Sequence, residues 1–188
     1  MPDLTQFNNT DATALRAALM RLTASPAWAD ALVAGRPYAD VDSLFAASDD
    51  SVTSLVESEI DAALSGHPRI GESAAGLDAE SKARSAREQS GMAEADHSLQ
   101  DAMARGNADY EQRFGRIYLV AAAGRSAEEL VRLLRERLGN DPEAELDVVR
   151  RELARITRLR LADMDAVTGN PLVPASTDPA RPPQEGTP

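Results

Sequence analysis

The chain has 188 residues, two histidines, no cysteine and a formal net charge of −11 at pH 7. The lack of cysteine excludes disulfides, thiolate zinc sites and cysteine nucleophiles. The acidic balance argues against a nucleic-acid partner, because the chain would repel a phosphate backbone, and no apolar run is long enough to span a membrane.

Apolar residues recur with helical spacing along most of the chain, which predicts an all-α fold, a single-domain irregular bundle of about eight helices. Helices are expected from Thr10 or Asp11 to Leu22, from Ser25 to Arg36, from Asp40 to Phe45, from Asp50 or Ser51 to Leu64, from Ser81 to Met103, from Asn107 to Phe114, from Ser126 to Leu138 and from Asp141 to Met164. Residues 1–168 would form this domain. Residues 169–188 are rich in proline and almost free of large apolar side chains, so we expect a disordered tail.

Turn-forming residues mark the expected boundaries. Ser25 and Pro26 form a helix start with proline at the first helical position, and Gly66 is expected to end the helix before it. A Gly-Asn pair is expected to interrupt the helical pattern, with Asn107 as the cap of the next helix. The apolar stretch RIYLVAAA, residues 116–123, could be either a buried strand-like segment or a helix, because periodicity does not separate the two.

The stretch SGHPRIGE holds one of the two histidines, His67, between Gly66 and Pro68. The proline restricts His67 to an extended backbone just after a predicted helix. Such a histidine could be structural, but a stiff turn also holds an imidazole in one direction, and its intrinsic pKa suits proton transfer near neutral pH. His97 lies in a helical pattern beside an acid, and we interpret it as part of a solvated helix face.

Polar residues on two predicted helices are further candidates for a site. Ser85, Glu88 and Gln89 are three and four residues apart and share one helix face, which could be wetted or could line a pocket for an amide-rich ligand. Near the end of the last helix, either Arg158 or Arg160 must turn toward the apolar stripe. That arginine would bind an anion such as a ligand carboxylate, or extend its head group back to water.

These residues belong to a longer, ordered set of motifs. The set comprises Ser25-Pro26-Ala27-Trp28-Ala29, Arg36-Pro37-Tyr38, Gly66-His67-Pro68-Arg69-Ile70-Gly71, Ser85-x-x-Glu88-Gln89, Asn107-x-x-Tyr110-x-x-x-Phe114-Gly115, the Arg116 to Arg125 segment and Ile156-x-x-Leu159-Arg160-Leu161. In this order the motifs resemble the 2-oxo-4-hydroxy-4-carboxy-5-ureidoimidazoline (OHCU) decarboxylase family over most of residues 14–165.

The resemblance implies an all-α fold particular to that family, commonly a homodimer. The implied reaction converts OHCU to (S)-allantoin and CO2, as the third step from urate to allantoin, without metal or organic cofactor. His67 and Glu88 would be the catalytic residues. The implied substrate contacts are Pro68, Ser85, Gln89, the backbone of Tyr118, Leu119, Val120, Ala121 and Ala122, and Arg160.

The resemblance also bears on partners and location. Urate oxidase and hydroxyisourate hydrolase are the implied pathway neighbours. Some eukaryotic relatives are peroxisomal and end in a receptor-read tripeptide, whereas this chain ends in Gly186-Thr187-Pro188. Its first ten residues lack the basic start and apolar core of a signal peptide, so we expect a cytoplasmic protein.

A cofactor-independent decarboxylation is chemically reasonable, because the imine and carbonyl of the substrate ring can spread the electrons that CO2 leaves behind. The protein must then orient the carboxylate, stabilise the charge and deliver a proton to one face. We assign the proton transfer to His67, while Glu88 would either orient His67 or accept the hydroxyl proton of the substrate. Arg160 would anchor an anionic or carbonyl oxygen, and Ser85 and Gln89 would read the amides.

Two other functions compete with this interpretation. In a non-catalytic helical interaction module, the apolar stripes and Arg125 would form a partner surface and His67 would be structural. In a metal-dependent hydrolase, His67, His97 and acids such as Glu88 would bind the metal. A shared pocket containing the predicted polar residues would count against the interaction module.

Overall fold

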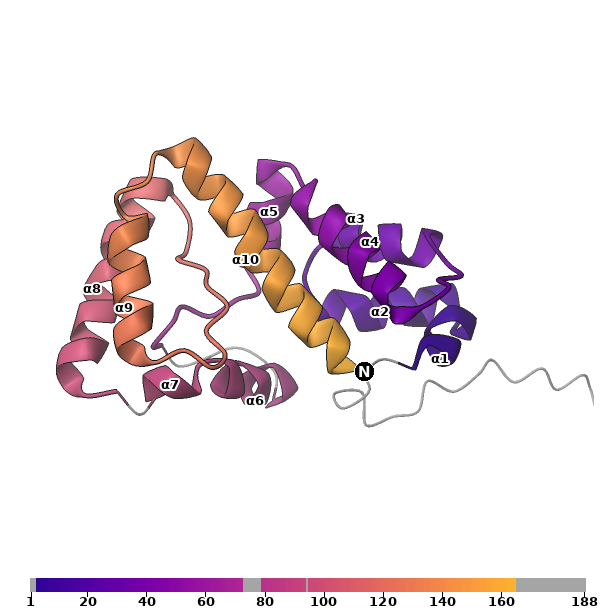
Figure 1. Cartoon of the computed structure of the whole chain (residues 1–188), viewed down its shortest axis with the longest axis horizontal. Coiled ribbons are helices and arrows are strands. Elements are labelled where there is room, and N and C mark those ends of the chain that lie inside the picture. Colours follow the sequence, from indigo (N-terminus) through magenta and orange to yellow (C-terminus); the bar gives the residue numbers. More distant parts are fainter. Residues whose placement is uncertain (1–2, 73–78, 94, 165–188) are drawn as a thin grey trace, which may run out of the picture.

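The computed structural model describes residues 3–72, 79–93 and 95–164, and every regular element in these ranges is a helix (Figure 1). The helices are α1 (Leu4–Asn9), α2 (Ala12–Leu22), α3 (Pro26–Ala34), α4 (Val41–Thr53), α5 (Glu57–Leu64), α6 (Ala79–Glu88), α7 (Ser90–Ala93), α8 (His97–Phe114), α9 (Ala127–Arg137) and α10 (Pro142–Ala162). The predicted all-α class is confirmed. The expected tail, residues 169–188, lies outside the described residues.

The helices form two groups, and α10 runs between them (Figure 1). Helices α1 to α5 lie on one side, with α2 and α4 packed against α10, and α8 and α9 lie side by side on the other. Because α8 and α9 run in the same direction, the chain between them travels back along their length (Figure 1). This connection contains residues 116–123, which are neither helical nor paired as a strand.

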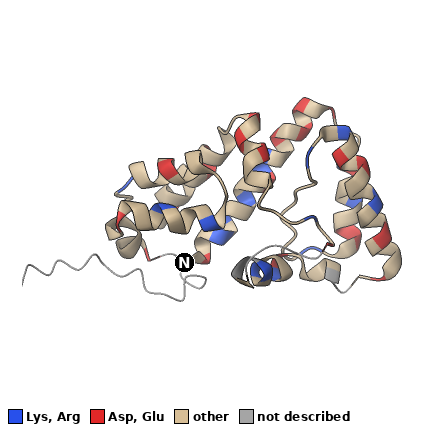
Figure 2. Ribbon diagram, turned by 180° about the vertical axis from the view of Figure 1, so that it is seen from behind, with Lys and Arg blue, Asp and Glu red and all other residues tan. Residues whose placement is uncertain are grey.

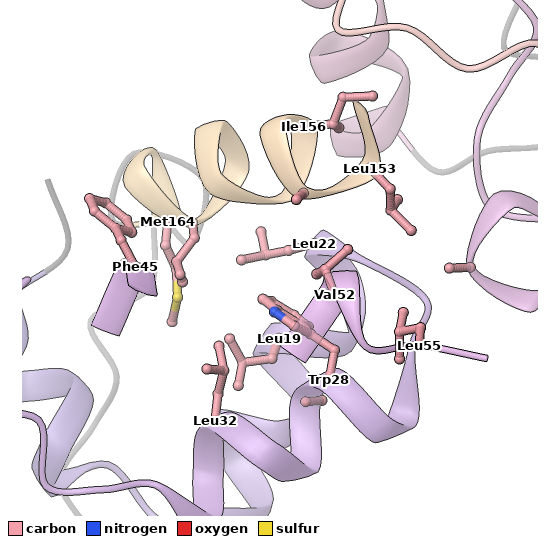
Figure 3. Packing of buried hydrophobic residues seen from close by; sticks show 14 of the residues in the cluster. Leu19, Leu22, Trp28, Leu32, Phe45, Val52, Leu55, Leu153, Ile156 and Met164 are labelled. Atoms are coloured by element: carbon pink, nitrogen blue, oxygen red, sulfur yellow. The ribbon is translucent and has the colours of Figure 1, made fainter. Parts of the chain in front are cut away.

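The first core lies between α10 and the helices α2 to α5 (Figure 3). Its fully buried members include Leu15, Leu19, Trp28, Leu32, Leu44, Val52, Ile60, Val149, Leu153 and Leu161. Trp28 is completely buried, and its indole nitrogen donates to the hydroxyl of Ser48 at 3.0 Å. The side chain therefore contributes a large apolar surface without leaving its donor unpaired.

The second core lies between α7, α8 and α9 and includes Met92, Met103, Tyr110, Leu130, Val131 and Leu134. Gly106 lies in the middle of α8, and a Cβ atom at this position would come within 2.4 Å of Leu134 Cδ2. The glycine thus permits close packing of α8 on α9. The expected interruption of the helix is wrong, because Asn107 uses its amide to donate to the carbonyl of Ile70 at 2.9 Å and does not cap a new helix.

Two other expected boundaries are also wrong. The helix that starts after Asp40 continues through Asp50 to Thr53, and the break falls at residues 54–56. There the carboxylate of Glu59 accepts from the backbone N–H of Val56 at 3.1 Å at the start of α5, and the side chain of Val56 is exposed. The stretch from residue 81 to 103 contains parts of three helices, α6, α7 and α8, where one was expected.

The charged side chains of α10 are distributed unevenly along the helix, with acidic residues near its first turn and basic residues toward its end (Figure 2). Glu143 and Glu145 lie in the first turn and Arg160 lies in the last, an order that complements the helix dipole. No helix of the described residues has both the length and the apolar composition to cross a bilayer.

Candidate active site

Four parts of the chain meet around one narrow cleft that is partly open to solvent. They are the turn after α5, the end of α6, the connection between α8 and α9, and the C-terminal half of α10. The lining residues are His67, Pro68, Ile70, Glu88, Gln89, Tyr118, Leu119, Val120, Ala121, Ala122, Ala123, Ile156 and Leu159. The structure thus brings nine of the predicted site residues to one cleft, and it places Ser85 and Arg160 directly behind them.

Two neighbours define the protonation of His67. Its Nδ1 lies 3.1 Å from the carbonyl oxygen of Ala63, and its Nε2 lies 3.1 Å from Nη1 of Arg160. A carbonyl oxygen only accepts a hydrogen bond and a guanidinium only donates one. His67 therefore carries its proton on Nδ1 and offers the lone pair of Nε2, which is the neutral form of the imidazole.

The surroundings also lower the pKa of His67 to about 3. Burial of the ring is the largest cause, and the positive charges of Arg160 and Arg84 add to it, while the hydrogen bond to Ala63 acts in the opposite direction. At neutral pH the side chain is therefore unprotonated at Nε2, where it has a lone pair to offer and no proton to donate.

Arg160 connects His67 to Glu88. Its Nε and Nη2 donate to the two carboxylate oxygens of Glu88, each at 2.8 Å, and its Nη1 also donates to the backbone carbonyl of Leu22 at 2.9 Å. This bidentate, largely buried pair holds the guanidinium in one plane. Among the described residues, Glu88 makes no direct hydrogen bond with His67, so any orienting effect of Glu88 on the imidazole passes through Arg160.

Of the two late arginines, Arg160 is the one that turns inward, and its anion is a carboxylate of the protein itself. Arg158 faces outward, where it pairs with Asp49 at 2.8 Å and lies over the ring of Phe45. Leu159, between them, is 48% exposed at the rim of the cleft.

Ser85 and Gln89 are tied to each other and to the histidine turn. The amide nitrogen of Gln89 donates to the hydroxyl of Ser85 at 3.3 Å, and its carbonyl oxygen accepts from the backbone of Gly71 at 3.0 Å. Ser85 is buried, so this helix face is not the wetted surface that the spacing also allowed. Gln89 retains a second amide hydrogen for the cleft.

Residues 118–122, which we call the wall segment, form another part of the lining of the same cleft. The side chains of Leu119 and Ala121 pack on the first core, whereas those of Tyr118, Val120 and Ala122 belong to the second core. This alternation is the mark of an extended chain, whose side chains point to opposite sides in turn. The wall segment is thus a single extended, unpaired stretch of chain that lies between the two cores.

Sequence reasoning missed several contributors to the cleft. Ile70, Ile156 and Leu159 line it as apolar positions of a turn and a helix, a type of residue that is common throughout the chain. The Ala63 carbonyl, which defines the tautomer of His67, carries no sequence signal at all. Arg125, assigned to a partner surface in the interaction-module alternative, instead bonds to the carbonyl of Ala121 at 3.0 Å and to Glu129.

His97 is the first residue of α8 and is exposed, in agreement with its interpretation as a solvated residue. It does not line the cleft. Within the part of the chain that the structure describes, no group of three or more histidine, aspartate or glutamate side chains is arranged to hold a metal ion.

Comparison with known proteins gives a consistent set of relatives. The family model "OHCU decarboxylase" matches residues 8–162. The 2-oxo-4-hydroxy-4-carboxy-5-ureidoimidazoline decarboxylase of Amia calva is 33% identical over 144 residues, which are 74% of this chain and 80% of that protein. The uric acid degradation bifunctional protein TTL of Arabidopsis thaliana is 35% identical over 104 residues, which are 54% of this chain and 32% of that longer protein.

Two solved structures share the fold. A crystal structure of OHCU decarboxylase in the presence of (S)-allantoin superposes with a TM-score of 0.64 at 24% identity, over 78% of this chain and 96% of that one. A crystal structure of (S)-allantoin synthase superposes with a TM-score of 0.66 at 16% identity, over 86% of this chain and 53% of that one.

Proposed function

The chain belongs to the OHCU decarboxylase family, and from that premise we propose that it converts OHCU to (S)-allantoin and CO2. One observation of this chain carries the proposal. The hydrogen-bonded series Glu88–Arg160–His67 borders a cleft whose other wall is the wall segment. Such a cleft combines a cation, a proton acceptor and amide groups, which together suit a small anionic heterocycle.

The chemistry defines what the site has to do. The bond between ring carbon 4 and the carboxylate breaks and CO2 leaves. The electron pair forms a double bond between ring carbons 4 and 5, while the electrons of the C5=N1 double bond move to ring nitrogen 1, which is protonated. The 4-hydroxyl then loses its proton to become a carbonyl, and ring carbon 5 receives a proton on one face. One proton is consumed overall. The protein must therefore move protons and present a single face of the ring.

Neutral His67 can accept the proton of the 4-hydroxyl at Nε2, and the resulting imidazolium can deliver a proton to ring carbon 5. Before this step, Arg160 has to release Nε2. A substrate carboxylate can draw the guanidinium away, because it offers Arg160 a second anion beside Glu88. Glu88 would then remain as the partner that keeps Arg160 in the cleft.

The amide groups of the substrate would be read by polar groups that are already oriented. Gln89 is held by Ser85 and Gly71, so its remaining amide hydrogen has a defined direction. The wall segment lines the same cleft. Preorganised donors and acceptors of this kind would hold the ring so that only one face meets His67.

We further propose that the protein is a cytoplasmic homodimer that works with urate oxidase and hydroxyisourate hydrolase. The support is the family membership together with the fused relative, whose name places it in uric acid degradation. Light scattering of the purified chain tests the dimer. A monomeric mass at the concentrations used for activity would remove that part of the proposal.

The reaction is tested by circular dichroism of a coupled assay in which urate oxidase and hydroxyisourate hydrolase produce OHCU in place. We expect a fast (S)-allantoin signal with the wild-type chain and its loss in His67→Ala. His97→Ala serves as the matched control, because it removes the other histidine from an exposed position. Slow formation of optically inactive product, unchanged by the folded protein, would refute the proposed function.

A further inference from the structure

The backbone of the wall segment is held by side chains on one edge only. Arg137 donates to the carbonyl of Leu119 at 2.6 Å, and Glu152 accepts from the N–H of Ala121 at 2.8 Å. Arg125 donates to the carbonyl of Ala121 at 3.0 Å. All three bonds use residues 119 and 121, whose backbone groups point the same way in an extended chain.

The residue between them, Val120, must therefore point its N–H and C=O to the opposite edge. Val120 is only 4% exposed and lines the cleft. Among the described residues, neither of its backbone groups has a hydrogen-bond partner. Buried backbone groups are nearly always paired, so this donor and acceptor together form a place for a ligand amide.

Helix α10 relates this edge to the other side of the cleft. Glu152, Ile156 and Arg160 are four residues apart in turn, so they lie along one face of the helix and span about 12 Å by helical rise. Arg160 binds His67 and Glu88, Ile156 lines the cleft, and Glu152 binds the wall segment. One rigid helix thus sets both walls relative to each other.

We propose that Glu152 is a positioning residue for the decarboxylation, which acts by holding the N–H of Ala121 so that the backbone of Val120 faces the cleft that His67 also lines. The inference rests on the proposed function. Glu152 is largely buried, and its second oxygen accepts from Arg155, an exposed side chain, at 3.1 Å. The oxygen that accepts from Arg155 is Oε1, so Oε2 is available to the N–H of Ala121 alone.

Three substitutions at this position separate the acceptor from the charge. Glu152→Ala removes the acceptor, and Glu152→Asp keeps the charge but shortens its reach by one methylene. Glu152→Gln keeps an oxygen that can accept. Arg155→Ala is the matched control, because it removes only the exposed neighbour. Steady-state kinetics on OHCU, the enantiomeric excess of the allantoin and the affinity for (S)-allantoin are measured well below each melting temperature.

We expect Glu152→Ala and Glu152→Asp to lose about tenfold or more in kcat/KM, with weaker (S)-allantoin binding and a lower enantiomeric excess. Glu152→Gln should stay within about threefold of wild type, because a neutral oxygen still accepts the bond. Arg155→Ala should match wild type. If Glu152→Ala does not fold, Glu152→Asp decides the question.

Wild-type kcat/KM and enantiomeric excess in folded Glu152→Ala or Glu152→Asp would overturn the positioning role, and so would equal impairment in Glu152→Gln. A wild-type chain that does not act on OHCU would instead refute the proposed function. In that case hydrogen exchange still tests Glu152: the Ala121 amide should exchange faster in Glu152→Ala than in wild type, but not in Glu152→Gln. Equal exchange rates in all three would overturn the inference.

Discussion

His67 illustrates how neighbours determine the chemistry of one side chain. The residue type and the stiff turn are visible in the sequence, and they are consistent with a role in proton transfer. The direction of that role depends on the Ala63 carbonyl and the Arg160 guanidinium, which define a neutral imidazole. Neither contact could be predicted from the sequence, because one neighbour is a backbone atom and the other lies 93 residues away in the chain.

The charge of Arg160 can be tested directly on His67. In Arg160→Gln we expect the pKa of His67 to rise from about 3, because a nearby cation is removed, but to stay below 6.5, because burial is the larger cause. NMR titration of the imidazole measures it. Arg158→Gln is the control, since that arginine faces Asp49 and not the cleft. A pKa that does not move in Arg160→Gln would contradict the electrostatic role of the guanidinium.

Burial of a neutral histidine also predicts how stability depends on pH. The unfolded chain binds a proton at His67 below about pH 6.5, whereas the folded chain does so only near pH 3, so acidification across this window favours unfolding. Through His67 alone, the free energy of unfolding falls by up to about 1.4 kcal/mol for each unit by which the pH is lowered in this window. Urea denaturation at several pH values should show that His67→Gln lacks this part of the slope. Parallel pH profiles for the two proteins would mean that His67 titrates normally in the folded state.

At the scale of elements, the starts of helices with strong capping residues could be predicted from the sequence, whereas the other helix boundaries depend on tertiary contacts. Asp11, Ser25, Ser126 and Asp141 each cap a helix where the sequence predicted one. Glycine often interrupts a helix, yet Gly106 lies inside α8. Leu134 occupies the space that a side chain at this position would take. A glycine needed for close packing and a glycine that ends a helix look alike in one sequence.

The wall segment shows the same limit more strongly. Its apolar run is compatible with a helix or a strand, and only the two cores on either side select the extended form. The residues that line the cleft could largely be named from the family motifs. What could not be predicted is which of their polar groups remain available, because Arg137, Glu152 and Arg125 occupy alternate backbone positions from distant parts of the chain.

Gly91 in α7 permits the backbone at Arg125 to pack closely against this helix, a role that helix propensity alone would not reveal. A Cβ atom there would lie 2.2 Å from the backbone oxygen of Arg125, just beyond the wall segment, whereas at Gly106 it would meet the flexible end of Leu134. Both glycines are helical, so alanine is intrinsically favoured by about 1 kcal/mol at each. We nevertheless expect Gly91→Ala to destabilise the protein by about 1–3 kcal/mol, because a backbone atom cannot move aside.

Urea denaturation of the two alanine variants measures this difference. Gly106→Ala is the comparison, since Leu134 can change its rotamer to make room, and it should cost less than Gly91→Ala. A Gly91→Ala protein as stable as wild type would mean that α7 can shift away from residue 125 without loss.

At the scale of the whole molecule, the wall segment joins the two cores, because it contributes side chains to both, and the first turn of α10 reaches the second group of helices through Glu145. The buried pair of Arg137 and Glu145 strengthens this junction. Glu145 accepts from Arg137 at 2.5 Å, from Asn140 at 2.7 Å and from the hydroxyl of Tyr110, while Arg137 also holds the carbonyl of Leu119. A substitution that destabilises the second core should therefore also destabilise the first core.

Trp28 is the single tryptophan of the chain and is buried in the first core, so its fluorescence reports on that core alone. Glu145→Ala removes one member of a buried ion pair and leaves the Arg137 charge uncompensated, which should cost about 3–5 kcal/mol. If the molecule unfolds as one unit, the Trp28 transition and the far-UV circular dichroism transition shift together to lower urea. Glu143→Ala, which removes an exposed acid from the same turn of α10, should leave both transitions in place. A Trp28 midpoint that stays at its wild-type value while the helical signal falls earlier would show that the two cores unfold separately, and that α10 does not couple the walls of the cleft as strongly as its contacts indicate.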